Sequence, residues 1–216
     1  PWVGNGGTLA LGTKLGTDSS PTDKLLLSGT SAVASGSTKV AITNLGGLGG
    51  LTTGKGIEVV GTENGASVQG GAFALAAPVV AGAYDYQLNS TSEGAYLTST
   101  STAPAPGPGP APGPVLYRAE VPLFAALPEQ LRQANLAMLG SMHQRIGDKG
   151  VSASNSNESG QRQSWGRILT VDRSITQGGT VSPHSQGRLN GFQAGTDLWA
   201  TPDWRAGVYV GQLDGD

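Results

Sequence analysis

The sequence predicts a mainly β protein with one long helix, and three observations lead to this fold class. Short β-like runs recur between Gly, Ser and Asn turns in the first half of the chain. Longer runs with alternating side chains lie near the end, and one apolar pattern with 3/4 spacing lies between the two sets. The 216 residues include 35 Gly and 13 Pro but no Cys, a composition that suits repetitive β structure.

The composition argues against several classes of function. A formal net charge of −2 argues against a basic nucleic-acid binder. The absence of Cys excludes disulfides, Cys-ligated zinc, Fe–S clusters and thiol catalysis. With only two His, His143 and His184, few metal sites are plausible, so we expect no metal and no cofactor.

The ends of the chain also carry an expectation. It starts at Pro1 without a signal segment, contains no run of about 18 apolar residues, and stops just after a β-like run. We therefore expect an excerpt of a longer protein.

Basic residues and prolines divide the chain. Every Arg lies after Tyr117, whereas Lys is the only basic residue type in residues 1–102. Between them, alternating Pro, Ala and Gly predict an extended spacer, with a PxxP ligand as the alternative reading. The expected parts are 1–102, a linker at 103–116, a helical part at 117–150 and a β part at 151–216.

The first part carries seven short β-like runs. They are 8–15, 24–28, 38–43, 57–62, 72–77, 83–88 and 95–100. Because they are short, punctuated by Gly and poor in aromatics, a parallel β-solenoid or its end cap fits better than a sandwich.

A single helix is predicted from 128 to 146, a length of about 28 Å at about 1.5 Å per residue. Pro128 suits the first helical position, and Glu129 suits the first turn. Apolar side chains at 3/4 spacing are Leu131, Ala134, Met138, Met142 and Ile146. Polar residues such as Arg132 and Arg145 make lipid exposure unacceptable, while small residues at Ala134, Ala137, Gly140 and Ser141 form a thin side. The pattern is that of a slim polar helix in an aqueous pore or, alternatively, of an ordinary amphipathic surface helix.

Three β-like runs follow, at 164–173, 187–199 and 205–212. In the second, Phe192 and Leu198 alternate with Gln193 and Asp197. A turn flanked by Trp199 and Trp204 joins the last two runs, as in a membrane-barrel hairpin at its interfacial girdle. A water-soluble hairpin with two surface Trp is the alternative.

Three patterns of catalytic or ligand-binding motifs occur in the sequence, and each lacks a required feature. Residues 49–55 match the start of a phosphate-binding P-loop, but Gly56 replaces the required hydroxyl and a β-like run follows where a helix is needed. A triad of Ser141 or Ser185 with His184 and Asp172 lacks a nucleophile elbow. Asp172, Asp197 and Asp203 lack calcium-loop spacing.

Segments along the whole chain, in order, resemble one protein family. They are 20–29, 36–40, 56–60, 71–75, 80–88, 117–128, 138–148, 165–167, 187–198 and 206–211. The first five resemble the C-terminal cap of the pertactin-like passenger of classical autotransporters (type V secretion). The others resemble the entry to the translocator, its pore helix and its opening barrel strands.

This resemblance implies a β-helix cap with an autochaperone role, followed by the pore helix and the start of an outer-membrane β-barrel. The implied autochaperone core is Leu25, Leu26, Leu27, Val40, Ile42, Ile57, Val59, Phe73, Leu75, Tyr84 and Tyr86. The implied pore-helix residues are Leu131, Ala134, Met138, Gly140, Met142 and Arg145. The implied barrel residues are Trp165, Arg167, Phe192, Asp197, Trp199, Trp204 and Tyr209.

The resemblance also implies partners and a location. The partners are outer-membrane lipid, the barrel-assembly machinery and periplasmic chaperones, without nucleic acid. The location is the outer membrane and the cell surface of a Gram-negative bacterium. Three strands alone leave sheet edges that lipid cannot satisfy, so we do not expect this segment to insert by itself.

The expected function is non-enzymatic export and display, and an adhesin or surface-binding β-helix fragment is the alternative. Relatives that cut the helix do so at an Asn pair, but Asn135 stands between Ala134 and Leu136. That cleavage is therefore not expected in this chain.

Overall fold

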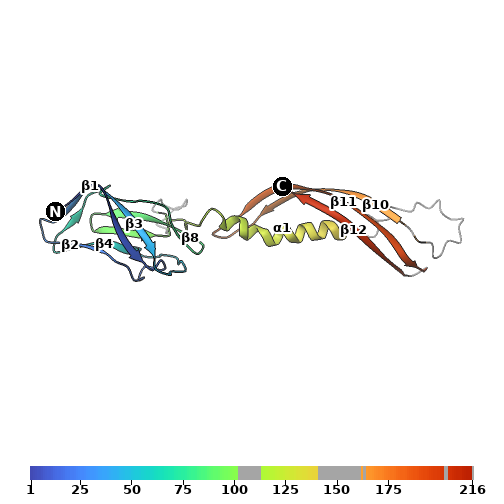
Figure 1. The fold of residues 1–216 in the computed structure, drawn as a ribbon, viewed down its shortest axis with the longest axis horizontal. Coiled ribbons are helices and arrows are strands. Elements are labelled where there is room, and N and C mark those ends of the chain that lie inside the picture. The colour runs from blue at the N-terminus through green and yellow to red at the C-terminus, as the bar shows by residue number, and fades with distance from the viewer. Residues whose placement is uncertain (102–112, 141–161, 163, 202–203, 216) are drawn as a thin grey trace. The chain divides into compact units, whose positions relative to one another are not determined.

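The computed structural model describes residues 1–101, 113–140, 162, 164–201 and 204–215. The chain forms two compact units, Pro1–Val121 and Pro122–Asp216, and we describe each by itself (Figure 1).

The first unit is built from strands. They are β1 (Trp2–Thr13), β2 (Leu25–Ser28), β3 (Val33–Asn44), β4 (Ile57–Glu63), β5 (Ser67–Val68), β6 (Phe73–Leu75), β7 (Val79–Ala81), β8 (Tyr84–Thr91) and β9 (Gly94–Thr98). All seven predicted runs coincide with strands. β5 and β7 have no counterpart among the predicted runs, because two or three residues are too few to show an alternating pattern.

Pairing in this unit changes from parallel to antiparallel along the chain. β3 pairs in parallel with β1, β5 and β6, and β2 pairs in parallel with β4. The register places Val40 between Leu9 and Leu75, which forms a ladder of apolar side chains across three strands. β4, β9, β8 and β7 are joined by antiparallel pairs. Several of these pairs join strands that are not neighbours in sequence, as β1 with β3, β2 with β4 and β4 with β9.

One apolar cluster forms the centre of the first unit. Val40, Ile57 and Val59 are fully buried, and Phe73 and Tyr86 are nearly so. Leu25, Ile42, Leu75 and Tyr84 are partly buried and pack against the cluster. Leu26, expected in the core, is 46% exposed whereas Leu27 is 8% exposed, because successive side chains of a strand point to opposite faces.

The predicted linker lies mostly outside the described residues. Its described end returns to the first unit, where Val115 bridges Thr100 and the Leu116 N–H donates to the Ser99 carbonyl. Tyr117 then stacks on Tyr84 at a ring-centroid distance of 5.7 Å.

All of α1 (Val121–Leu139) except its first residue belongs to the second unit, and the helix starts seven residues before the predicted position. Pro122 lies in the first turn, where its missing N–H costs nothing, and Pro128 lies inside the helix. Glu129 therefore lies in the middle of the helix, where its carboxylate accepts hydrogen bonds from the Arg132 and Gln133 side chains. Among the described residues, no helix is both long enough and apolar enough to cross a membrane.

The end of the helix also differs from the prediction. α1 ends at Leu139, and Gly140 has a φ of 54°, the left-handed conformation that commonly stops a helix. Gly140 is therefore a terminating residue, not part of a thin helical side. Met142, Arg145 and Ile146 lie outside the described residues.

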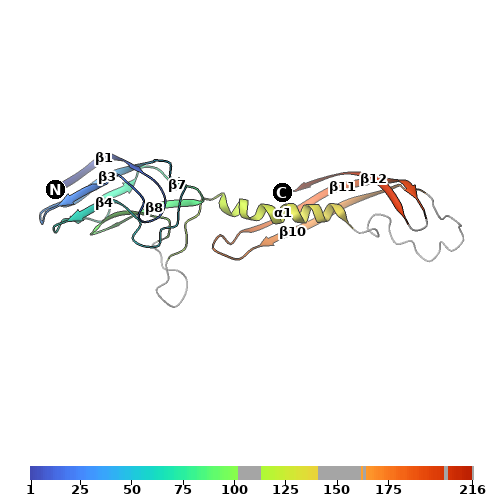
Figure 2. The same cartoon turned by 90° about the horizontal axis from the view of Figure 1, so that it is seen from below.

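An antiparallel sheet accompanies this helix. β10 (Ser164–Thr176), β11 (His184–Ala200) and β12 (Arg205–Gly215) pair in sequence order. Both views place α1 along this sheet (Figures 1 and 2). All three predicted runs coincide with these strands, and each observed strand extends beyond its prediction.

Candidate functional site

The Tyr86 hydroxyl joins three segments of the first unit. It accepts the Gly50 N–H at 2.8 Å, and lies 2.9 Å from both the Gly16 and the Gly50 carbonyl oxygens, either of which can take its proton. Burial raises the pKa of this hydroxyl, which keeps it in the neutral form that can donate. Tyr86 therefore ties β8 to two loops that are far away in sequence.

A second tie uses the carboxylate of Asp18. Its Oδ1 accepts the N–H groups of Gly54 and Gly56 at 3.0 and 2.8 Å, and its Oδ2 accepts that of Thr53 at 3.0 Å. Partial burial raises the pKa of Asp18, but the three N–H donors outweigh it and lower the pKa below its ordinary value. The backbone donors of the P-loop-like segment are thus satisfied by a carboxylate of the chain itself.

The same loop is held by a buried hydroxyl pair. The Thr52 N–H donates to Ser99 Oγ and the Ser99 N–H donates to Thr52 Oγ1, each at 2.8 Å. Both residues are fully buried. Such a pair satisfies two backbone donors that would otherwise be costly to bury.

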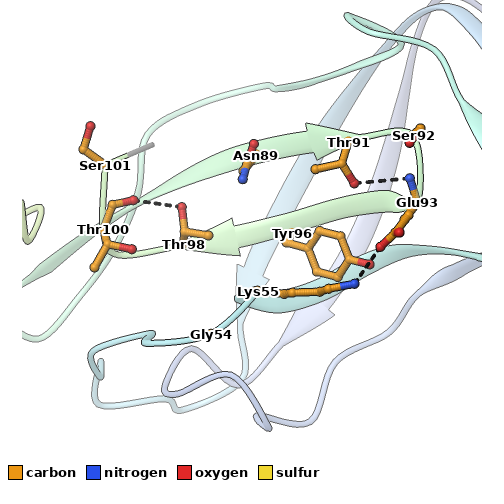
Figure 3. A pocket seen from close by; sticks show the side chains of 10 residues that line it. All are labelled: Gly54, Lys55, Asn89, Thr91, Ser92, Glu93, Tyr96, Thr98, Thr100 and Ser101. Atoms are coloured by element: carbon orange, nitrogen blue, oxygen red, sulfur yellow. Dashed lines mark hydrogen bonds and ion pairs between the residues drawn. The ribbon is translucent and has the colours of Figure 1, made fainter. Parts of the chain in front are cut away.

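A cavity of about 470 Å³ lies on the outer side of the β8–β9 hairpin (Figure 3). Figure 3 shows Lys55 Nζ bonded to Glu93 Oε2, 2.6 Å away, beside the Tyr96 ring. The hydrogen bond to Glu93 raises the pKa of Lys55 and lowers that of Glu93. The remaining lining residues are Gly54, Asn89, Thr91, Ser92, Thr98, Thr100 and Ser101. The cavity is polar and suits a ligand with hydroxyl or amide groups.

In the second unit, Arg167 and Gln193 hold the end of α1. Arg167 donates from Nε to Gln193 Oε1 at 2.7 Å, and from its guanidinium to the Met138 carbonyl at 3.0 Å. Gln193, which is 2% exposed, donates from Nε2 to the same carbonyl at 2.8 Å. Carbonyls at a helix C-terminus lack helical partners and attract positive charge, so this pair satisfies both needs.

Glycines let side chains pack closely on the face of the sheet that carries Arg167 and Gln193. Register places Gly195 between Trp165 and Tyr209, whose rings are 6.3 Å apart. A Cβ at Gly195 would lie 2.7 Å from the Trp165 ring, and one at Gly211 would lie 2.9 Å from Met138 Cε. Both positions therefore need glycine for the observed packing.

The other predicted residues occupy different surroundings. Phe192, Trp199 and Trp204 are exposed, and Asp197 is half-buried. Ala134 and Met138 are half-buried on α1, but Leu131 is exposed and does not share their packing. Gln130 instead contacts the sheet, donating to Ser185 Oγ at 3.1 Å.

In the described parts of the chain, no three His, Asp or Glu side chains gather closely enough to hold a metal ion. The described residues offer polar ties, a polar cavity and a capped helix.

Comparison with known proteins identifies the first unit. Residues 1–88 match the family model described as Autochaperone Domain Type 1. The chain is also 35% identical over 160 residues, 68% of its length, to the Adhesin BmaC autotransporter of Brucella suis biovar 1 (strain 1330). The chain carries an autotransporter autochaperone region.

Two relatives from Escherichia coli (strain K12) resemble different shares of the chain. The uncharacterized protein YuaQ is 45% identical over 87 residues, 40% of the chain, and the uncharacterized protein YdeU is 28% identical over 230 aligned positions, 97% of the chain. The chain spans 4% of the Brucella protein, 6% of YuaQ and 47% of YdeU. The autochaperone region contains Tyr86, Asp18 and most of the buried cluster.

Several residues that make these hydrogen bonds were not predicted from the sequence. Gln193 was noted only as an alternating polar residue, yet a lone amide among inward-facing glycines could have marked a contact with the helix. Asp18, Thr52 and Ser99 carry no local signal, because their partners lie 35 to 47 positions away.

Proposed function

We propose that the chain is a non-enzymatic module of type V secretion. The autochaperone region forms the β-helix cap of a passenger, α1 is a pore helix, and the β10–β12 sheet is the beginning of an outer-membrane barrel. In this proposal the module works in the outer membrane and at the surface of a Gram-negative bacterium, with lipid, barrel-assembly machinery and periplasmic chaperones as partners.

One observation supports this proposal most strongly: the C-terminal end of α1 rests on a part of the sheet that carries polar side chains and glycines beside the Trp165 and Tyr209 rings. Arg167 and Gln193 bind its last carbonyls there, whereas Ile168, Phe192 and Val210 point away and are exposed. A soluble sheet covered by a helix would place its apolar face under the helix. At this end of the sheet, the arrangement is that of a polar barrel interior with an apolar outside.

The autochaperone region supplies the folding part of the mechanism. Ile57, Val59 and Val40 are fully buried, and burial contributes about 25 cal/mol per Å² of apolar surface. Folding of this core outside the cell stabilises the exported segment and opposes its return through the pore. β1, the edge strand that pairs in parallel with β3, then offers a template for the coil before it.

Export with core variants tests this proposal. Ile57→Asn and Phe73→Asn should leave barrel assembly unchanged but lower the yield of folded passenger at the surface. Protease treatment of whole cells measures the surface yield, and a heat-modifiability gel measures barrel assembly. Equal surface yields in the variants and the parent would contradict the proposal.

A second candidate function is adhesion, which the polar cavity on the β8–β9 hairpin favours. The Brucella relative is named an adhesin, and the cavity of about 470 Å³ offers hydroxyl, amide and charged groups. Asn89→Trp should fill it and reduce cell attachment without lowering surface yield, whereas unchanged attachment would remove this candidate. Val80→Trp, at an exposed position of β7 outside the lining of the cavity, serves as the control.

A further inference from the structure

The outer face of the β10–β12 sheet is apolar near the turn that joins β11 and β12. We call these side chains the apolar band: Ile168, Phe192, Ala194, Leu198, Val208 and Val210, all exposed. At the same level the inward positions include the polar Arg167 and Gln193, and Gly195, which lies between the Trp165 and Tyr209 rings. The register joins the band across strands, with Ile168 opposite Phe192 and Ala194 opposite Val210.

The two faces exchange character toward the other end of the sheet. We call the outward side chains there the polar band: Thr170, Asp172, Ser174, Gln186, Arg188, Asn190, Gln212 and Asp214. Arg188 Nε lies 2.6 Å from Asp172 Oδ1 in this band. Inward positions at this end include Ile175 and Leu189, which are buried. This end therefore has the pattern of a sheet in water, with apolar side chains inside.

We propose that lipid hydrocarbon covers only the apolar band, that its edge lies between Phe192 and Asn190, and that the polar band stands clear of the hydrocarbon. This inference rests on the proposed function and adds the depth at which the strands meet the membrane.

Three features favour lipid as the occupant. A membrane-spanning strand needs about 9–11 residues, and the segment from Phe192 to Ala200 has about that length. Trp199 and Trp204 lie at the far edge of the band, where interfacial aromatics belong. The hydroxyls of Ser164 and Thr196, on the outer face within the band, bond each other at 3.0 Å, so they need no partner from solvent.

The ion pair of Arg188 and Asp172 indicates that the polar band lies outside the hydrocarbon. Arg188 and Asp172 both keep more than half of their side-chain surface exposed. Lipid contact would remove that hydration from an ion pair that gains little in return. Water or headgroups are therefore the surroundings that these side chains match.

Single cysteines test the depth directly, because the chain has no Cys of its own. Ala194→Cys and Val208→Cys report on the apolar band, and Ser174→Cys and Gln186→Cys on the polar band. Each is made in the protein assembled in its own membrane and is treated with a membrane-impermeant maleimide. A fluorophore on each cysteine is then exposed to nitroxide-bearing lipids in purified proteoliposomes.

We expect residues 194 and 208 to lose labelling by the impermeant reagent and to be quenched by the nitroxide lipids. Residues 174 and 186 should be labelled and should escape quenching. Quenching at all four positions overturns the depth assignment but leaves the membrane barrel intact. Labelling of residues 194 and 208 by the impermeant reagent contradicts the barrel itself.

Protection of residues 194 and 208 without quenching by lipid would show a protein partner there and overturn the inference. A heat-modifiability gel confirms assembly of each variant, and Val210→Cys and Arg188→Cys replace any variant that does not assemble.

Discussion

Gln193 Nε2 donates a 2.8 Å hydrogen bond to the carbonyl of Met138, and so fixes the end of α1 to the middle of β11. Gln193 also accepts from Arg167, which reaches the same carbonyl. A buried amide with both functions satisfied stabilises one arrangement of helix and sheet, because any other leaves polar groups unpaired.

Replacing this amide should loosen the end of the helix. In the membrane-assembled protein, Gln193→Leu leaves the Met138 carbonyl without its amide donor and removes an acceptor from Arg167, at a cost of about 1–3 kcal/mol. Hydrogen exchange should become faster at the amides of Ala137, Met138 and Leu139. Gln186→Leu on the outer face is the control, and equal exchange in the two variants would contradict the role of Gln193.

Removing the Tyr86 hydroxyl should destabilise the autochaperone region. Tyr86→Phe leaves the Gly50 N–H and two carbonyls without their buried partner, and we expect a loss of about 1–3 kcal/mol in the free energy of unfolding. Pulse proteolysis in urea measures this loss. Tyr84→Phe is the matched control, since no hydrogen bond of its hydroxyl forms part of this tie, and a similar loss in both variants would argue against the tie.

The Asp18 tie should depend on pH. Its pKa is lowered in the folded state, so its contribution is present above the ordinary value of 3.8 and is lost as the pH falls through the folded pKa. Asp18→Asn should therefore be destabilised relative to the parent at pH 6, with the difference shrinking below about pH 4.

Urea unfolding at pH 6 and pH 3 measures that difference. Glu63→Gln, at the exposed end of β4, is the control and should match the parent at both pH values. A difference for Asp18→Asn that stays the same between pH 6 and pH 3 would show that the carboxylate charge has no part in the tie.

Local patterns predicted the strands well, and failed where the decisive partner is distant. Period-two alternation located β11 and β12, and 3/4 spacing showed that a helix exists. Pro122 and Pro128, six positions apart, both suit a helix start, and the start predicted at Pro128 was wrong because Pro128 is tolerated inside α1. Contacts of Asp18 and Tyr86 depend on how loops fold back, which no local pattern contains.

Burial within β2 supplies the most direct test of the central claim that core folding drives display. Leu27 is buried and Leu26, its neighbour, is 46% exposed, so the same substitution can be placed inside and outside the core. The measurement is the ratio of protease-protected passenger at the cell surface to assembled barrel, in Leu27→Asn and Leu26→Asn. The account predicts a clearly lower ratio for Leu27→Asn and a parental ratio for Leu26→Asn. Equal ratios in both variants and the parent would contradict it.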